Sequence, residues 1–418
     1  MAASVDKQRN LLRGESTLHE RLMFYAILVA SVLSSSVILP RVLGIVLLVG
    51  VYGVFLLIAF HRRGYAAAGP AYAFAFVVLL ACIMVVNHTR GYFGGLTDLF
   101  FPLVTTFLVC ANLFVLPHVV DAGYFLYGVN RLSAAVVVVG IPSIILGDLT
   151  VLWFTIENWP ATREMHLLGW EHNPLRSIYS GSQNNTAVLL FVGVLAGANE
   201  FVRNRSYIPA ILLMINGIGL YLTHSRGGIA VAVLGFGVLL SYWIAGRWFA
   251  GTLALVGGVA FFLGVLTHVG VLPGPSWLNL VNINDRSELW HGGYEAFRRR
   301  PGLGYGIVDT ADVLKPYIPE DKKGLEMHGA YFRMFLYTGA MGGITYMLFI
   351  LYSIADNLYF DGVDIAIFAI AVAFAVHHFQ GGAPIFGAYF KAVGPGLAFG
   401  YLLNSNATGR DGDNSLVK

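Results

Sequence analysis

Long apolar runs alternate with short polar stretches along most of the chain. Each run has the length, roughly 17–25 residues, that a helix needs to cross the hydrocarbon core of a bilayer. No run alternates between apolar and polar residues with a period of two, so the pattern favours helices over strands. The twelve runs lie near residues 22–39, 42–60, 66–86, 98–117, 132–156, 184–202, 206–223, 227–246, 248–271, 333–354, 363–380 and 384–404.

The composition agrees with a membrane protein. Of the 418 residues, 57% are hydrophobic and 12% are charged, and the mean hydropathy is +0.69. A soluble protein carries about 25% charged residues, so this chain lacks the charge for a surface that faces water. These values exclude a soluble enzyme, a disordered tail and a collagen-like fibre. We expect an all-α polytopic membrane protein of about twelve transmembrane helices.

Basic residues in short loops predict the orientation, because cytoplasmic loops carry an excess of lysine and arginine. If the N-terminal tail, residues 1–21, is cytoplasmic, the other basic short loops share its side. These basic residues are Lys7, Arg9, Arg13 and Arg21 in the tail, and Arg62, Arg63, Arg131, Arg203, Arg205 and Arg247 in the loops. We therefore expect an integral membrane domain over residues 22–404, a cytoplasmic C-terminal tail over 405–418, and a helical outer insertion, 272–332, between the ninth and tenth spans.

Four polar stretches at the expected outer face hold the candidate chemistry: 172–185, 222–228, 282–306 and 326–342. Charged side chains at a membrane boundary cost free energy unless they are paired, hydrated or used. Arginine suits a phosphate ligand, because its guanidinium stays charged and binds phosphate bidentately. Histidine suits the activation of a hydroxyl group, because its pKa lies near about 6.5. Each stretch also has a plainer interpretation, as a helix cap, an interfacial side chain or a solvated loop.

The third stretch predicts an amphipathic helix that Asn284 or Asp285 caps and Pro301 ends. The residues that fall on one side at helical spacing are Leu289, Trp290, Gly293 and Phe297. Such a helix is expected to lie on the outer leaflet. The run Arg298–Arg300 ends it, where the helix dipole favours cations, and indicates a solvated or headgroup-facing end.

Several catalytic motifs are absent from the sequence. It contains no Walker A loop, no H-E-x-x-H motif and no Asp-x-Asp pair in an outer loop. We therefore expect no ATP hydrolysis by a Walker A loop, no catalytic metal and no cofactor. The pair His377-His378 lies inside an apolar run without facing carboxylates, so packing or pore polarity is the preferred interpretation.

Four motifs follow one another in the polar stretches. They are R-S-I-Y-S-G-x-x-N-N from Arg176 to Asn185, T-H-S-R-G-G from Thr223 to Gly228, R-x-x-L-W-x-x-x-x-x-x-F-x-x-x-P-x-L-G-Y-G from Arg286 to Gly306, and H-G-A-Y-F-R-M-F-L-Y-T-G-A-M-G from His328 to Gly342. This order resembles the O-antigen ligase/polymerase superfamily of bacterial inner-membrane glycosyltransferases. The resemblance covers roughly residues 170–345. Many members have asparagine where this chain has Gly329.

The resemblance implies a bundle of twelve helices with a large periplasmic loop. Within the superfamily the chain is most similar to the O-antigen ligases, which transfer O-antigen polysaccharide from undecaprenyl diphosphate to a sugar hydroxyl of lipid A-core. The implied partners are this lipid-linked glycan, the lipid A-core acceptor and the membrane lipids, with no nucleic acid. The implied site faces the periplasm from the inner membrane, and transfer inverts the anomeric centre without a metal.

The resemblance also implies roles for particular residues. Carried onto this chain, Arg226 and Arg286 hold the donor diphosphate, and His328 acts as the base or positions the acceptor hydroxyl. Further candidates for contacts to the donor or the acceptor are Arg176, Asn185 and Arg333.

Three alternatives stay open. An O-antigen polymerase shares the expected fold but uses a second lipid-linked glycan as acceptor, and a protein O-oligosaccharyltransferase uses a periplasmic protein. A twelve-helix transporter of lipids or solutes has the same hydropathy. Transporters place polar residues at mid-membrane in broken helices, whereas here the polar residues gather at one face. Asp148, inside the expected span 132–156, is the exception.

Overall fold

A computed structural model of the chain describes residues 16–63, 69–87, 96–158, 165–167, 170–179, 182–268, 272–273, 286–358, 363–381 and 383–409. Its helices are α2 (Leu18–Leu33), α3 (Arg41–Arg63), α4 (Ala71–Asn87), α5 (Leu96–Phe114), α6 (Leu116–Val119), α7 (Ala122–Leu146), α8 (Gln183–Asn204), α9 (Tyr207–Leu222), α10 (Arg226–His268), α11 (Arg286–Arg299), α12 (Thr310–Leu314), the 3-10 turn η3 (Glu320–Lys322), α13 (Ala330–Ala355), α14 (Ile365–Gln380) and α15 (Phe390–Gly409). Two antiparallel hairpins join β1 (Leu149–Val151) to β2 (Phe154–Ile156) and β3 (Met165–Leu167) to β4 (Trp170–His172).

The described helices form a multi-pass membrane protein. Six are long and apolar enough to cross a bilayer: Arg41–Arg62, Phe100–Val119, Ala122–Leu146, Gln183–Asn204, Arg226–Gly264 and Ala330–Ala355. Three shorter apolar helices accompany them, Ala71–Asn87, Tyr207–Leu222 and Ile365–Gln380. Every predicted run overlaps a described helix, and α10 breaks at Gly246 (φ 78°), the last residue of the predicted run 227–246. The helical polytopic class is thus confirmed, while the number of crossings stays a prediction.

One predicted span, 132–156, is wrong at both ends. The helix there is α7, which begins earlier because the Asp121 carboxylate caps it by accepting from the Gly123 N–H at 2.7 Å. It ends at Gly147, whose φ of 86° a helix does not adopt. The apolar residues that follow form the β1–β2 hairpin, so they lengthened the apolar run without extending the helix. Asp148 accordingly lies in a loop, where it accepts from the Asn158 N–H at 2.7 Å.

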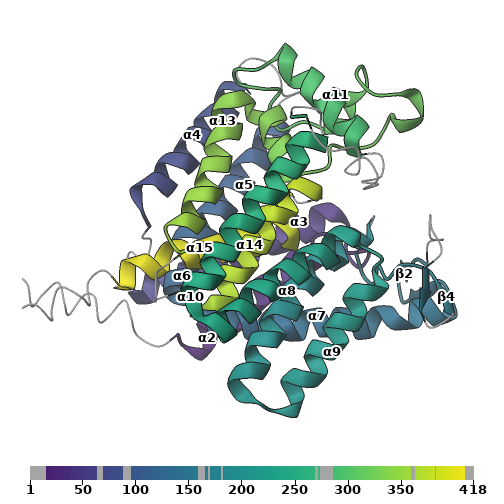
Figure 1. Ribbon diagram of the computed structural model, residues 1–418, viewed down its shortest axis with the longest axis vertical. Helices are drawn as coiled ribbons and strands as arrows, with labels where there is room; N and C mark the ends of the chain where they lie inside the picture. The colour runs from purple at the N-terminus through teal and green to yellow at the C-terminus, as the bar shows by residue number, and fades with distance from the viewer. Residues whose placement is uncertain are drawn as a thin grey trace, which may run out of the picture.

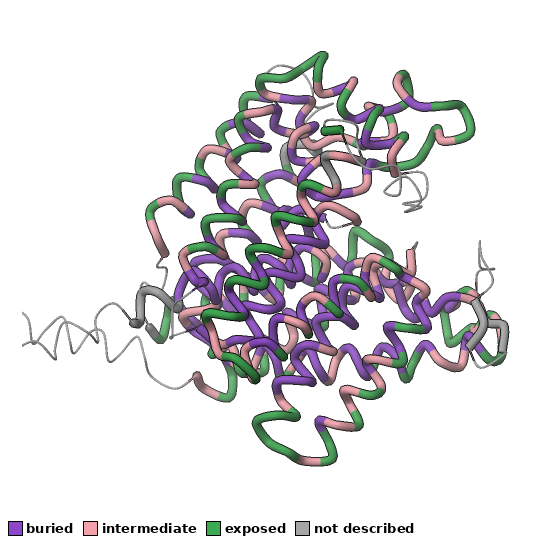
Figure 2. The backbone as a smooth tube through the Cα atoms, in the orientation of Figure 1, coloured by how far each residue is buried: buried purple, intermediate pink, exposed green. Residues whose placement is uncertain are grey.

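Helix α14 lies at the centre of the bundle (Figure 1). Its residues from Ile365 to His378 are all buried, and it packs against α8, α10, α13 and α15. Figure 2 shows the buried backbone gathered in this central part, with exposed positions on the outer faces of the surrounding helices. Apolar side chains on those outer faces, such as Val42 at 72% exposure, suit contact with lipid.

A small second core lies under α11, at one end of the bundle (Figure 1). It is formed by Leu289, Trp290, Ala296, Leu314, Ile318, Met327 and Leu336. The predicted amphipathic helix is confirmed as α11, but its apolar side packs on this core and not on a lipid leaflet. The residues predicted to cap it, Asn284 and Asp285, lie outside the described residues.

The segment 301–306, which we call the strap, docks into a break in α13. Two of its backbone N–H groups donate to carbonyls of α13 at 2.7 and 2.9 Å, and its Pro301 carbonyl accepts from the Ala340 N–H at 2.7 Å. The helix backbone is broken at Gly339 (φ 64°), where an added Cβ would lie 2.2 Å from the Gly302 carbonyl oxygen. Glycine at Gly339 therefore allows the backbone of the strap to approach the backbone of α13 closely. This contact fixes the strap on the membrane helix.

Replacing Gly339 by alanine is expected to destabilise the protein by about 1–3 kcal/mol from the backbone conformation alone, with the clash adding to this. The measurement is thermal unfolding of the detergent-purified protein. Gly258→Ala is the matched control, because no atom lies within 4 Å of the added Cβ there. Equal unfolding temperatures for the two variants would contradict the proposed docking.

Candidate active site

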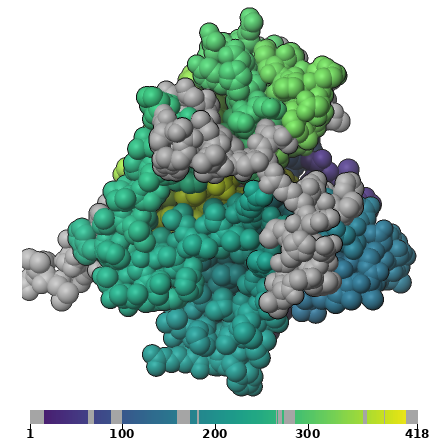
Figure 3. Space-filling view, turned by 45° about the vertical axis from the view of Figure 1, so that its right-hand side comes forward, coloured from purple at the N-terminus to yellow at the C-terminus, as the bar shows by residue number. Residues whose placement is uncertain are grey.

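A cavity of about 1160 Å³ opens where several helices begin. Its walls come from segment 34–41, the start of α8, the loop 307–310, the start of α13, and segment 381–391. Figure 3 shows a hollow between the green outer part and the teal helices, with the yellow C-terminal chain at its floor. The volume exceeds the roughly 300–1,000 Å³ of a small-molecule pocket, which suits a large substrate.

His328 lies in the cavity wall immediately before α13. Its carbonyl accepts from Trp290 Nε1 of α11 at 3.0 Å, so the second core holds its backbone. The next residue, Gly329, has a φ of 99°, and an added Cβ would lie 2.7 Å from the Phe379 carbonyl oxygen at the end of α14. The chain therefore needs glycine here, where many members of the superfamily have asparagine. His328 is clamped between α11 and α14.

The surroundings of His328 keep its imidazole neutral. Burial, together with the positive charges of Arg286, Lys391 and Arg333, lowers its pKa to about 4. A neutral imidazole at pH 7 can accept a proton from a hydroxyl group. An anion bound among these cations would offset their charges and raise the pKa of His328 again, which makes the base stronger.

Arg333 is held rigidly in the first turn of α13. Its Nε donates to the Met327 carbonyl at 2.6 Å, and its guanidinium forms an ion pair with Glu326 at 2.6 Å. Both Arg333 and Glu326 line the cavity. Arg333 therefore presents a positive charge that one carboxylate already offsets in part.

Arg286, the first residue of α11, is half-buried, and its charge acts on His328. It lies outside the cavity wall itself, and burial lowers the pKa of its guanidinium. Among the residues that the structure describes, no carboxylate lies within ion-pair distance of it. The chain thus holds a partly desolvated cation beside the histidine.

Arg226 begins α10 and is exposed, and it does not line the cavity. The preceding residue, Ser225, donates from Oγ to Asn184 Oδ1 at 2.8 Å, and Asn184 and Asn185 both line the cavity. The structure therefore brings Asn185, His328 and Arg333 to one cavity, with Arg226 and Arg286 close to it.

Arg176 does not line the cavity. Its motif instead shapes a wall, because the Ile178 carbonyl accepts from the Val37 N–H at 2.8 Å and Ser177 Oγ donates to the Val136 carbonyl at 2.5 Å. The segment 34–41 that it supports was missed as a site element, since its apolar and serine residues resemble an ordinary turn between two spans.

Lys391 was also missed. It is the second residue of α15, lines the cavity, and acts on His328 through its charge. A signal was present in the sequence, because Lys391 is the only lysine, arginine, aspartate or glutamate between Asp364 and Arg410. A lone charge inside an apolar run is a functional hypothesis by default.

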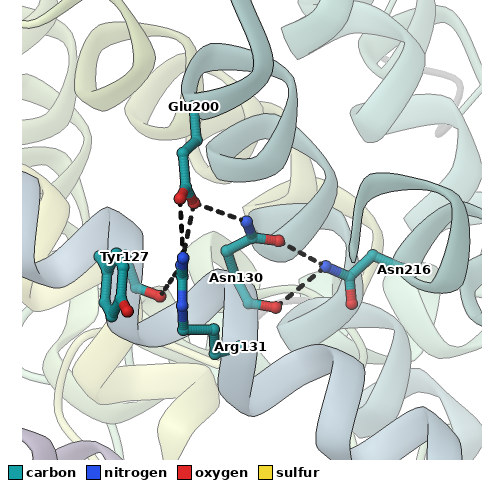
Figure 4. A network of polar contacts seen from close by, with 5 residues as sticks. All are labelled: Tyr127, Asn130, Arg131, Glu200 and Asn216. Carbon is teal, nitrogen blue, oxygen red and sulfur yellow. Dashed lines mark hydrogen bonds and ion pairs between the residues drawn. The ribbon is translucent and has the colours of Figure 1, made fainter. Parts of the chain in front are cut away.

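A second polar cluster joins α7, α8 and α9 (Figure 4). Arg131 forms an ion pair with Glu200 at 2.8 Å, Asn130 donates to the same carboxylate at 2.8 Å, and Asn216 donates to Asn130 at 2.9 Å. None of these residues lines the cavity. Their hydrogen bonds join three apolar helices, so the cluster fixes helix packing.

The fold and the cavity define a class: a multi-pass helical membrane protein with a cationic cavity among the starts of its helices. Residues 209–347, about a third of the chain, match the model of the O-antigen ligase family. Three of the four motifs fall within the matched segment, which supports the resemblance to the O-antigen ligase/polymerase superfamily. The comparison with curated proteins returns no match. The match supports an O-antigen ligase- or polymerase-type function, with polysaccharide and lipid substrates in general.

Proposed function

We propose that the protein is an O-antigen ligase that transfers O-antigen polysaccharide from undecaprenyl diphosphate to a sugar hydroxyl of lipid A-core. The observation that carries this proposal is the neutral imidazole of His328 in the cavity wall, on which the charges of several cations act. His328 lies inside the segment that matches the family. We place the site on the periplasmic face of the inner membrane, with residues 22–404 as the catalytic membrane domain and 272–332 as its periplasmic insertion.

In this proposal Arg226 and Arg286 hold the donor diphosphate at the cavity edge. The acceptor oxygen forms a bond to the anomeric carbon, the bond from that carbon to the diphosphate oxygen breaks, and the acceptor proton passes to His328. Undecaprenyl diphosphate leaves with the bonding electrons, and attack from the opposite face inverts the anomeric configuration. Fixed guanidinium groups stabilise the charge that develops on the leaving group, so the step requires neither a nucleotide nor a metal.

The remaining candidates support these groups. Asn185 presents an amide to the cavity from the start of α8, where it can bind a sugar hydroxyl of the donor or the acceptor. Arg333, fixed by Glu326, adds positive charge beside His328. Arg176 does not contact the substrates in this proposal; its motif supports segment 34–41 of the cavity wall.

The test is a transfer assay with purified protein, undecaprenyl-diphosphate-linked glycan and lipid A-core, with and without a chelator. Glycan-capped lipid A-core that forms equally in both conditions supports the proposal. Lengthened lipid-linked glycan without capped product would identify a polymerase instead. A periplasmic protein acceptor and reconstituted transport are tested next if neither product forms.

The pH dependence of this transfer follows from the lowered pKa of His328. Only the neutral imidazole accepts a proton, and in the empty enzyme it stays neutral down to about pH 4. We therefore expect kcat/KM, which reports free-enzyme groups, to stay level from pH 8 to about pH 5 and to fall below this range. In kcat the acid limb lies at higher pH, because the bound diphosphate raises the pKa of His328. An acid limb of kcat/KM near about 6.5, the ordinary pKa of histidine, would contradict this account of the site. Full recovery of the rate at pH 7 is the control for unfolding.

A further inference from the structure

The cavity floor carries a lysine for which the fold gives no structural reason. Lys391 lies in the first turn of α15, half-buried, and lines the cavity. The start of a helix carries a partial positive charge, so a cation is unfavourable there. Partial removal of an ammonium group from water adds a further free-energy cost.

No group of the described chain balances this charge. The charges that act on Lys391 are those of Arg286, Arg333 and Glu326, which are two cations and one carboxylate. Glu326 already forms an ion pair with Arg333 at 2.6 Å. Within the described ranges, no carboxylate lies within 4.0 Å of Lys391. The cluster therefore holds an excess of positive charge that faces the cavity.

Segment 34–45 of the same cavity lining is mostly apolar, with Ser34, Ser35, Ser36 and Arg41 as its polar members. The apolar part of this wall includes Val37, Ile38, Leu39, Pro40, Ile45 and Phe101. This wall continues along α3 to Val42 and Val46, which are 72% and 57% exposed on the surface that suits lipid. A ligand with an anionic head and an apolar tail matches both the cations and these apolar residues, whereas a free phosphate matches only the cations, which include Arg41.

We propose that Lys391 binds the diphosphate of a polyprenyl-linked donor through its ammonium group, with the lipid chain leaving the cavity along α3. This inference rests on the proposed function and adds a residue and a lipid path to it. The oxygens of a bound phosphate accept hydrogen bonds from the ammonium group, and their negative charge offsets its positive charge, so the unfavourable position of Lys391 becomes favourable. The same anion offsets the charges that act on His328, which links donor binding to the strength of the base.

The test measures binding of geranylgeranyl diphosphate to the full-length protein in detergent by isothermal titration calorimetry. Replacing Lys391 by methionine, which keeps the length of the side chain, is expected to weaken binding by about 10- to 100-fold. Lys391→Arg is expected to stay within a few-fold of the unmodified protein. Lys315→Met is the matched control, since Lys315 is exposed at the end of α12. Thermal unfolding of each variant reports whether it is folded.

The outcomes separate the inference from the function on which it rests. Equal binding by the unmodified protein and folded Lys391→Met overturns the role of Lys391 and leaves the proposed function intact. Failure of the unmodified protein to bind any polyprenyl diphosphate overturns both. Inorganic pyrophosphate is the second probe: if it binds as tightly as the lipid, the lipid path along α3 is wrong. If Lys391→Met unfolds, the Lys391→Arg variant decides, and a large loss of affinity in that variant with an intact fold contradicts a simple charge contact.

Discussion

Replacing His328 by alanine is expected to lower kcat for glycan transfer by about 10²–10⁴-fold, the usual contribution of a general base. The loss follows from the position of the imidazole, which lines the cavity beside the cations that hold the leaving group. The variant is expected to fold, because Trp290 bonds to the carbonyl of residue 328 and not to its side chain. Initial rates of capped lipid A-core, normalised to purified protein, measure the effect.

His291→Ala serves as the matched control for this variant. His291 lies on the exposed side of α11, away from the cavity wall. Its loss is expected to leave the rate unchanged. Normal transfer by the alanine variant at position 328 would remove this histidine from the mechanism. A raised KM with an unchanged kcat would instead assign it to binding of the acceptor.

Replacing Arg286 by alanine is expected to lower kcat by about 10²–10³-fold, as for the loss of one fixed group in comparable electrostatic sites. The guanidinium is half-buried beside His328, and the described chain provides no carboxylate to pair with it, so its charge is available to a ligand. Arg226→Ala is expected to act in the same direction, with a smaller effect on kcat than on KM, because its side chain is exposed.

Arg205→Ala is the matched control for both arginine variants. Arg205 is exposed at the far end of α8 from the cavity, at a position whose φ of 44° alanine tolerates no worse than arginine does. Rates measured at low and high ionic strength add a second check, since salt screens the exposed Arg226 more than the half-buried Arg286. Equal rates for Arg286→Ala and Arg205→Ala would exclude a diphosphate contact at position 286.

Much of the architecture was predictable from the apolar pattern, because bilayer thickness sets the length of each run. The pattern failed where apolar residues continued past a helix end, as in the β1–β2 hairpin after Gly147. It also could not distinguish lipid from protein as the partner of an apolar face. For α11 that partner is the second core, which includes Leu314 and Met327.

The candidate site was predictable in part from polar residues next to the spans. His328, Arg333 and Asn185 lie in one cavity, and the order of motifs alone could not show that they meet in space. Segment 34–41 was missed because its position depends on backbone contacts with residues distant in sequence. The glycines at 304 and 339 were recognised only as motif letters, and their role in docking the strap required the three-dimensional contact.

The central claim is that this cavity releases a lipid diphosphate as it transfers a glycan. The most direct measurement is mass spectrometry of undecaprenyl diphosphate released by the purified protein in the presence of a chelator. The account predicts one undecaprenyl diphosphate for each capped lipid A-core, with no release without acceptor and none beyond background with the His328→Ala variant. Capped product without released undecaprenyl diphosphate, or release that does not require His328, would contradict it.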